Sequence, residues 1–141
     1  MKNLIAGITL PVLLAGCWGA PPNERILGQA CLDLFSGDPD MTRNLLSENA
    51  VITVDGFCDC YASRSVAQTA TIDLHKDVLN AINSTRAETG LGVEDAVKRI
   101  DEVKESDGAF ETFTSQQLDD VGDFFQSVAA SMGDSGTCPA S

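Results

Sequence analysis

The sequence predicts an all-α protein, an irregular bundle of five or six helices fastened by two disulfides. Apolar residues recur at helical spacing over most of the chain. One β-branched run, residues 51–54, could form a strand, but no second run could pair with it, so we interpret it as an extended linker or a helix end. The chain has five cysteines, and four of them follow Cys17. An even number of cysteines is typical of disulfides in exported proteins.

The first helix is expected to begin at Asn23, a suitable N-cap, with Glu24 in its first turn. Ser36 and Gly37 end it. Its apolar face consists of Ile26, Leu27, Ala30, Cys31 and Leu34.

A shorter second helix should follow, capped by Asp40 and running through Leu45 and Leu46. Pro39 supports this start, because proline cannot continue a preceding helix.

A long helical region is expected over residues 57–87. Its apolar line drifts around the helix, which predicts a kink or a restart at residues 71–73, where Thr71 could cap a new helix. Gly90 and Gly92 then separate this region from the next helix.

Two further helices complete the bundle. The first has its apolar face at Val93, Ala96, Val97, Ile100 and Val103 and is closed by Gly108. The second begins with a capping box of Thr114 and Gln117 and ends before Gly133. Its apolar residues are Leu118, Val121, Phe125, Val128 and Met132.

The cysteines that follow residue 17 are Cys31, Cys58, Cys60 and Cys138. Four cysteines allow three connectivities. A bond between Cys58 and Cys60 would close a strained ring, so two arrangements remain. Helical phase favours one of them: Cys58 shares the apolar line of its helix with Tyr61, whereas Cys60 shares the polar line with Arg64. Cys58 should therefore meet Cys31, which leaves Cys60 for Cys138.

Two other functions are open to these thiols. Cys58-Asp59-Cys60 could serve as a thiol-disulfide redox pair, although it lacks the Cys-x-x-Cys spacing of thioredoxin-like proteins. A four-thiolate metal site is the other, but the cysteine spacings match no compact zinc motif. We therefore expect neither a metal site nor a cofactor.

Acidic residues offer a weaker alternative, a calcium site. The loop Asp38-Pro39-Asp40 lacks the central glycine and final glutamate of an EF-hand loop. The remaining candidates are Asp119, Asp120 and Asp123, which we interpret as helix surface.

No catalytic motif fits the predicted fold. The segment Gly133-Asp134-Ser135-Gly136 resembles the nucleophile segment of trypsin-like serine proteases, but that family needs two β-barrels and a histidine in an early loop. The sole histidine, His75, is expected on an exposed helix surface. We therefore predict a protein that is not an enzyme.

The charge balance excludes nucleic acid as a partner. Nine Lys and Arg residues stand against 21 Asp and Glu residues, which gives a net charge of −12. The longest basic block is Lys98-Arg99, and binding to phosphate backbones depends on many such residues.

The N-terminal residues carry an export signal. Lys2 precedes an almost uninterrupted apolar run over residues 4–14, which is too short to span a bilayer and contains Pro11. The sequence Leu14-Ala15-Gly16-Cys17 at its end resembles the lipobox of bacterial lipoprotein precursors. An ordinary secretory leader, cut elsewhere, is the alternative.

The resemblance implies cleavage before Cys17, so that residues 1–16 are a signal peptide and Cys17 carries the lipid, including palmitate. Residues 17–22 would be a short tether, and residues 23–141 a single helical domain without internal repeats. Trp18 stands where this family usually has an acidic residue for inner-membrane retention, which favours the outer membrane, facing the periplasm. We expect a lipid-anchored envelope protein that binds a periplasmic partner protein.

Overall fold

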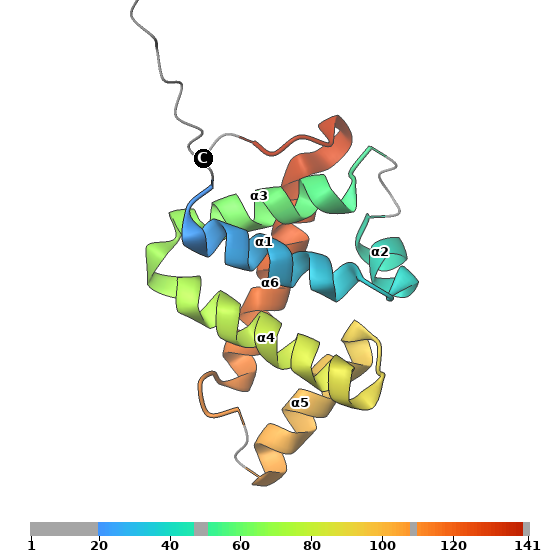
Figure 1. Cartoon of the computed structure of the whole chain (residues 1–141), viewed down its shortest axis with the longest axis vertical. Coiled ribbons are helices and arrows are strands. Elements are labelled where there is room, and N and C mark those ends of the chain that lie inside the picture. The colour runs from blue at the N-terminus through green and yellow to red at the C-terminus, as the bar shows by residue number, and fades with distance from the viewer. Residues whose placement is uncertain (1–19, 47–50, 108–109, 140–141) are drawn as a thin grey trace, which may run out of the picture.

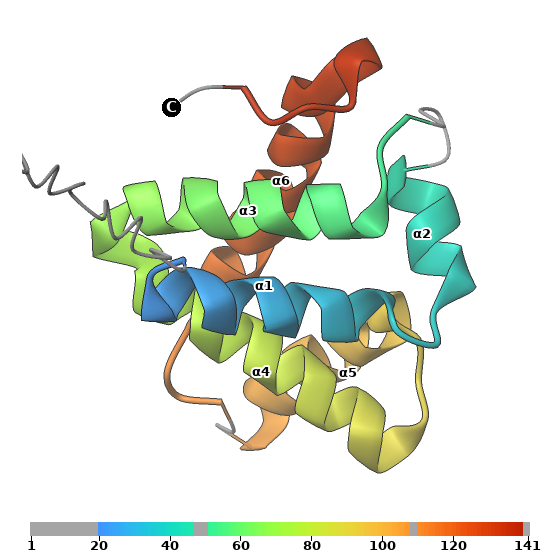
Figure 2. The ribbon, with the colours of Figure 1, turned by 45° about the horizontal axis from the view of Figure 1, so that its top comes forward.

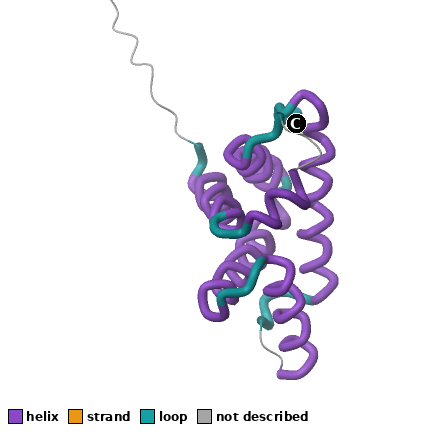
Figure 3. The backbone as a smooth tube through the Cα atoms, turned by 90° about the vertical axis from the view of Figure 1, so that its right-hand side faces the viewer, coloured by secondary structure: helices purple, strands orange, loops and turns teal. Residues whose placement is uncertain are grey.

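The computed structural model describes residues 20–46, 51–107 and 110–139. This part of the chain folds into six α-helices and two 3₁₀ turns, with no β-strand (Figures 1 and 3). The α-helices are α1 (Pro22–Phe35), α2 (Pro39–Leu46), α3 (Val54–Ala67), α4 (Ile72–Thr89), α5 (Val93–Asp107) and α6 (Ser115–Met132), and the 3₁₀ turns are η1 (Thr69–Thr71) and η2 (Gly133–Ser135). The all-α prediction is confirmed. Cys17, the predicted signal peptide before it and Gly108 lie outside the described residues.

The helices α3, α1 and α4 lie side by side in that order (Figure 2). Helix α6 lies behind them and crosses all three, whereas α5 packs against α4 (Figure 1). Within the described residues, no helix combines the length and apolar character needed to cross a membrane.

The core is centred on two aromatic residues of α3, Phe57 and Tyr61, which are fully buried. The Phe57 ring lies 5.6 Å from that of Phe35 on α1 and 5.5 Å from that of Phe125 on α6, measured between centroids. Aromatic rings of this kind bury large apolar areas and contribute strongly to core stability. Helix α3 therefore packs against both α1 and α6 through Phe57.

The first two helices begin differently from the prediction. Helix α1 begins at Pro22 and has no side-chain cap, so the prediction that Asn23 caps it is wrong. Proline fits the first turn because its missing N–H would have no partner there. Helix α2 begins at Pro39 for the same reason, and its cap is Asp38 rather than Asp40: the Asp38 carboxylate accepts from the Met41 N–H at 3.0 Å.

Residues 51–54 form the linker and helix end that the sequence predicts, and α3 begins at Val54, earlier than expected. Thr53 caps it by accepting a hydrogen bond from the Gly56 N–H at 3.1 Å. The predicted restart after α3 is confirmed: η1 interrupts the chain before α4. The Thr71 hydroxyl donates to the Gln68 carbonyl and does not cap α4.

The capping box that begins α6 is confirmed. The Gln117 N–H donates to the Thr114 hydroxyl, and the Gln117 side chain accepts from the Thr114 N–H. As predicted, α6 ends at Met132, before Gly133. These local signals fix the helix ends independently of tertiary contacts.

Candidate functional site

A groove of about 1260 Å³ opens among α2, α5 and α6. Helix α2 and the beginning of α5 lie on the same side of the molecule (Figure 1), and α6 contacts α2. Buried apolar side chains of α1, α4 and α6 form the floor, among them Leu34, Leu79 and Phe125. The walls carry apolar side chains that are only half-buried, namely Met41, Leu45, Val93, Val97 and Ala129. The groove thus offers apolar surface that the fold leaves partly uncovered.

Carboxylates surround this apolar surface. The exposed acidic residues that line the groove are Asp40, Glu94, Asp95, Asp119 and Asp123. Among the described residues that line it, there is no lysine or arginine. Arg43 and Lys98 stand outside it and pair with Asp40 at 2.9 Å and with Glu94 at 2.8 Å. We refer to the groove, with its apolar floor and acidic edge, as the acidic groove.

Asp38 connects two walls of the acidic groove. One carboxylate oxygen accepts from the Met41 N–H at the start of α2, and the other accepts from the Val93 N–H at the start of α5, at 2.6 Å. Gly92 allows this approach, because a Cβ there would lie 3.1 Å from Asp38 Oδ2. Burial alone would raise the pKa of Asp38, but the two N–H donors and the Arg86 charge outweigh it and lower that pKa below its ordinary value.

The carboxylates do not gather around a common point. The described residues contain no group of three or more His, Cys, Asp or Glu side chains that could hold a metal ion. Both oxygens of Asp38 are occupied by backbone donors, and Asp119, Asp120 and Asp123 are exposed along α6. These acidic residues therefore contribute charge to the surface rather than a ligand set.

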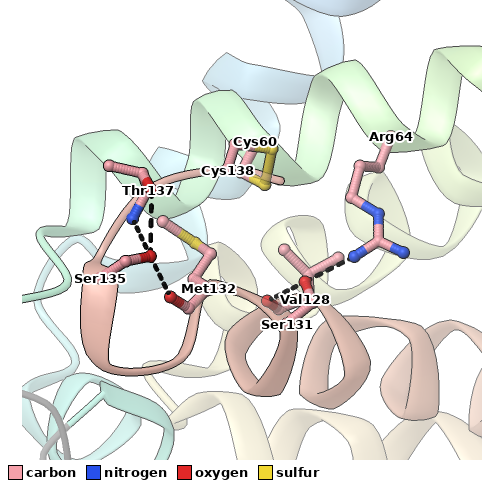
Figure 4. Close-up of a disulfide and its surroundings, with 8 residues drawn as sticks. All are labelled: Cys60, Arg64, Val128, Ser131, Met132, Ser135, Thr137 and Cys138. Carbon is pink, nitrogen blue, oxygen red and sulfur yellow. Dashed lines mark hydrogen bonds between the residues drawn. A yellow bond between two sulfur atoms is a disulfide. The ribbon is translucent and has the colours of Figure 1, made fainter. Parts of the chain in front are cut away.

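The two predicted disulfides are confirmed. Cys31 on α1 bonds to Cys58 on α3, and both are fully buried in the core. Cys60 bonds to Cys138 in the C-terminal tail (Figure 4). The assignment of Cys60 to a polar helix face is wrong, because its side chain is only 1% exposed.

The C-terminal tail is held to the domain by more than the Cys138 bond. Gly136 has φ of +64°, and a Cβ there would lie 2.7 Å from the Val51 carbonyl oxygen, so only glycine fits. The Ser135 hydroxyl donates to the Met132 carbonyl at 2.9 Å and contacts the Thr137 hydroxyl (Figure 4). Ser135 is thus engaged within the tail.

The prediction that His75 is an exposed surface residue is wrong, because His75 is only 3% exposed. Its Nδ1 lies 2.8 Å from the Tyr61 hydroxyl, and its ring packs 4.9 Å from that of Phe124 on α6. Burial raises the pKa of Tyr61 and lowers that of His75. At neutral pH the Tyr61 hydroxyl therefore shares this hydrogen bond with an uncharged imidazole.

The buried imidazole makes stability depend on pH. An unfolded histidine ionises at about pH 6.5, whereas folded His75 has a lowered pKa. As the pH falls below about 6.5, the unfolded chain binds a proton that the folded chain does not. The free energy of unfolding should therefore fall between pH 7 and pH 5, by at most about 1.4 kcal/mol per pH unit.

Chemical denaturation across this pH range checks the expectation. His75→Asn keeps a hydrogen-bonding partner for the Tyr61 hydroxyl, because an amide can donate or accept, but it does not titrate, so its unfolding free energy should lose this slope. An equal slope in both proteins would show that another group is responsible.

Comparisons with protein-family models, with curated proteins and with solved structures found no match for this chain. Fold and site define its class: a disulfide-bonded α-helical domain that carries an open acidic groove.

Proposed function

We propose that the protein is a non-enzymatic lipoprotein of the bacterial cell envelope whose helical domain binds a partner protein in the periplasm through the acidic groove. The observation that carries the binding proposal is the half-buried apolar surface on α2, α5 and α6. Binding sites are typically concave surfaces lined by apolar side chains with a few polar groups among them.

The anchor proposal rests on Leu14-Ala15-Gly16-Cys17. Acyl chains on Cys17 would each contribute about 0.8 kcal/mol per buried methylene, so two or more chains would anchor the protein stably at a membrane. Cleavage removes Lys2 and no acidic residue, which leaves 8 basic against 21 acidic residues, a balance of 8 − 21 = −13. Trp18 supports the outer membrane as the destination.

Lipidation can be tested with radioactive palmitate in cells that express the protein. The wild type should be labelled and should sediment with membranes, whereas Cys17→Ala should lose both properties. Equal labelling of the variant, or an intact N-terminal methionine on the native protein, would contradict the anchor.

The internal polar groups support binding rather than catalysis. His75 and Tyr61 satisfy each other in the core, and Asp38 is bonded to two helix starts. Cys58 and Cys60 bond to different partners, which argues against the two acting together as a redox pair. We therefore prefer the binding role to the thiol-disulfide alternative.

Photo-crosslinking in intact cells tests the binding role. A benzophenone amino acid at Ala130, which is exposed and lines the acidic groove, should give a discrete adduct with an envelope protein. The matched control is Ala67, an exposed alanine at the end of α3 that does not line the groove. The same adducts from both positions, or none from Ala130, would contradict the proposal.

A further inference from the structure

We propose that the acidic groove binds a basic amphipathic helix, a segment with an apolar stripe flanked by lysine and arginine. This inference rests on the proposed function and deepens it by naming the class of partner. It follows from the shape of the groove and from its charge.

The shape suits a polypeptide helix. Pockets for small molecules usually measure about 300–1,000 Å³, and this groove of about 1260 Å³ is larger and open to the surface. Its sides are formed by helices, so an entering helix can pack its own apolar stripe between them. The described residues form no strand, so they provide no sheet edge to which an extended peptide could add.

The apolar positions are distributed to receive such a stripe. Leu45 projects from α2, Val97 from α5 and Ala129 from α6, and all three are half-buried. A helix lying among them would cover apolar surface from three directions, which is the contact that an i, i+3, i+4 pattern provides.

The charge selects a basic helix. Asp119 and Asp123 lie one turn apart on α6, are exposed, and form no ion pair within the described part of the chain. Asp95, across the groove on α5, pairs with Lys98, whose Nζ lies 3.7 Å from Asp95 Oδ1, so Asp119 and Asp123 are the main carboxylates available to an incoming basic segment. A second copy of this chain would bring like charge, because its net charge is −12.

Two synthetic peptides of about 18 residues, five helical turns, provide the probe. Both carry the same leucine stripe, but one has lysine and the other glutamate at all polar positions. Binding to the full chain, purified in a nonionic detergent, is measured by fluorescence anisotropy. Titration of each peptide into the detergent alone gives its partition, which is subtracted. The lysine peptide should bind more tightly, and added salt should weaken it.

Charge reversal locates the binding site. Asp119→Lys with Asp123→Lys should weaken the lysine peptide by about tenfold or more and strengthen the glutamate peptide. The control, Asp59→Lys with Glu88→Lys, changes the net charge equally at exposed positions outside the groove and should leave both affinities unchanged. Thermal melting confirms that both variants fold.

The outcomes separate this inference from the proposed function. Equal binding of the two peptides, or an equal loss in the control variant, overturns the basic helix as the occupant. If Ala130 nevertheless crosslinks to an envelope protein in cells, the proposed function stands and only the class of partner is wrong. If the lysine peptide binds in the groove but no cellular partner is captured at Ala130, the inference stands and the proposed function falls.

Discussion

Replacing Cys31 and Cys58 together with alanine should lower the free energy of unfolding by about 4 kcal/mol. The bond closes a loop with a sequence separation of 27 residues, and loop-closure entropy alone contributes about 3.5 kcal/mol for such a loop. Both sulfurs are fully buried between α1 and α3, so their removal also leaves a void in the core. This is a large fraction of the stability of a domain of this size.

Replacing Cys60 and Cys138 provides the comparison. The separation of 78 residues would predict about 4.5 kcal/mol from loop closure. However, Cys138 lies in an exposed tail, and a released tail regains its entropy while the helices stay folded. We therefore expect a smaller loss than for the core disulfide.

Urea denaturation followed by far-UV circular dichroism measures both losses, and mass spectrometry of alkylated protein checks that the remaining disulfide is intact. A loss from the tail variant that equals or exceeds that of the core variant would show that the tail unfolds together with the helices.

Asp38→Ala should cost about 3 kcal/mol of stability. The substitution removes two acceptors for backbone N–H groups, those of Met41 and Val93, and each charge-assisted cap of this kind contributes about 1–2 kcal/mol. The exposed neighbour Asp40 serves as the control, because Asp40→Ala removes only a surface ion pair and should cost less than about 1 kcal/mol.

The Asp38 contribution should also depend on pH. Its pKa is lowered in the folded state, so the stabilisation is fully present above the unfolded value of about 3.9. This stabilisation is lost as the pH falls from about 3.9 through the lowered pKa of Asp38 in the folded state. The difference in unfolding free energy between the wild type and Asp38→Ala should therefore shrink below about pH 4. A constant difference down to pH 2 would contradict a role for the charged carboxylate.

The helices could be predicted because their signals are local. Repeating apolar residues and the Thr114–Gln117 capping box lie within a few residues of the ends they fix. The cysteine pairing could be predicted for a related reason: a short ring excluded one arrangement, and the apolar line of α3 directed Cys58 toward the core. The error at Asn23 came from overlooking that Pro22 can begin a helix without a cap.

The burial of His75 and Cys60 could not be predicted from their neighbours in sequence. His75 is covered by Phe124, and Cys60 bonds to Cys138 in the tail, both far along the chain. Each residue lies beside polar side chains in sequence, so local pattern suggested a surface position. Burial of this kind depends on which elements pack together, which helical periodicity does not specify.

The acidic groove was missed for the same reason. Its walls come from three helices separated by long stretches of chain, and half-buried positions such as Leu45 and Val97 have the same spacing as core positions. One signal was available: Asp119 and Asp123 lie beside the apolar stripe of α6, so the sequence does place charge next to apolar surface there.

The two hydrogen bonds that join Asp38 to the starts of α2 and α5 have a consequence for recognition. Because one carboxylate fixes the first turns of two walls, the distance between them is set before any ligand arrives. Such a preorganised receptor loses little conformational entropy on association. Affinity should therefore depend on the rigidity of this connection as well as on direct contacts, so that removing the Asp38 carboxylate should weaken binding by loosening the two walls.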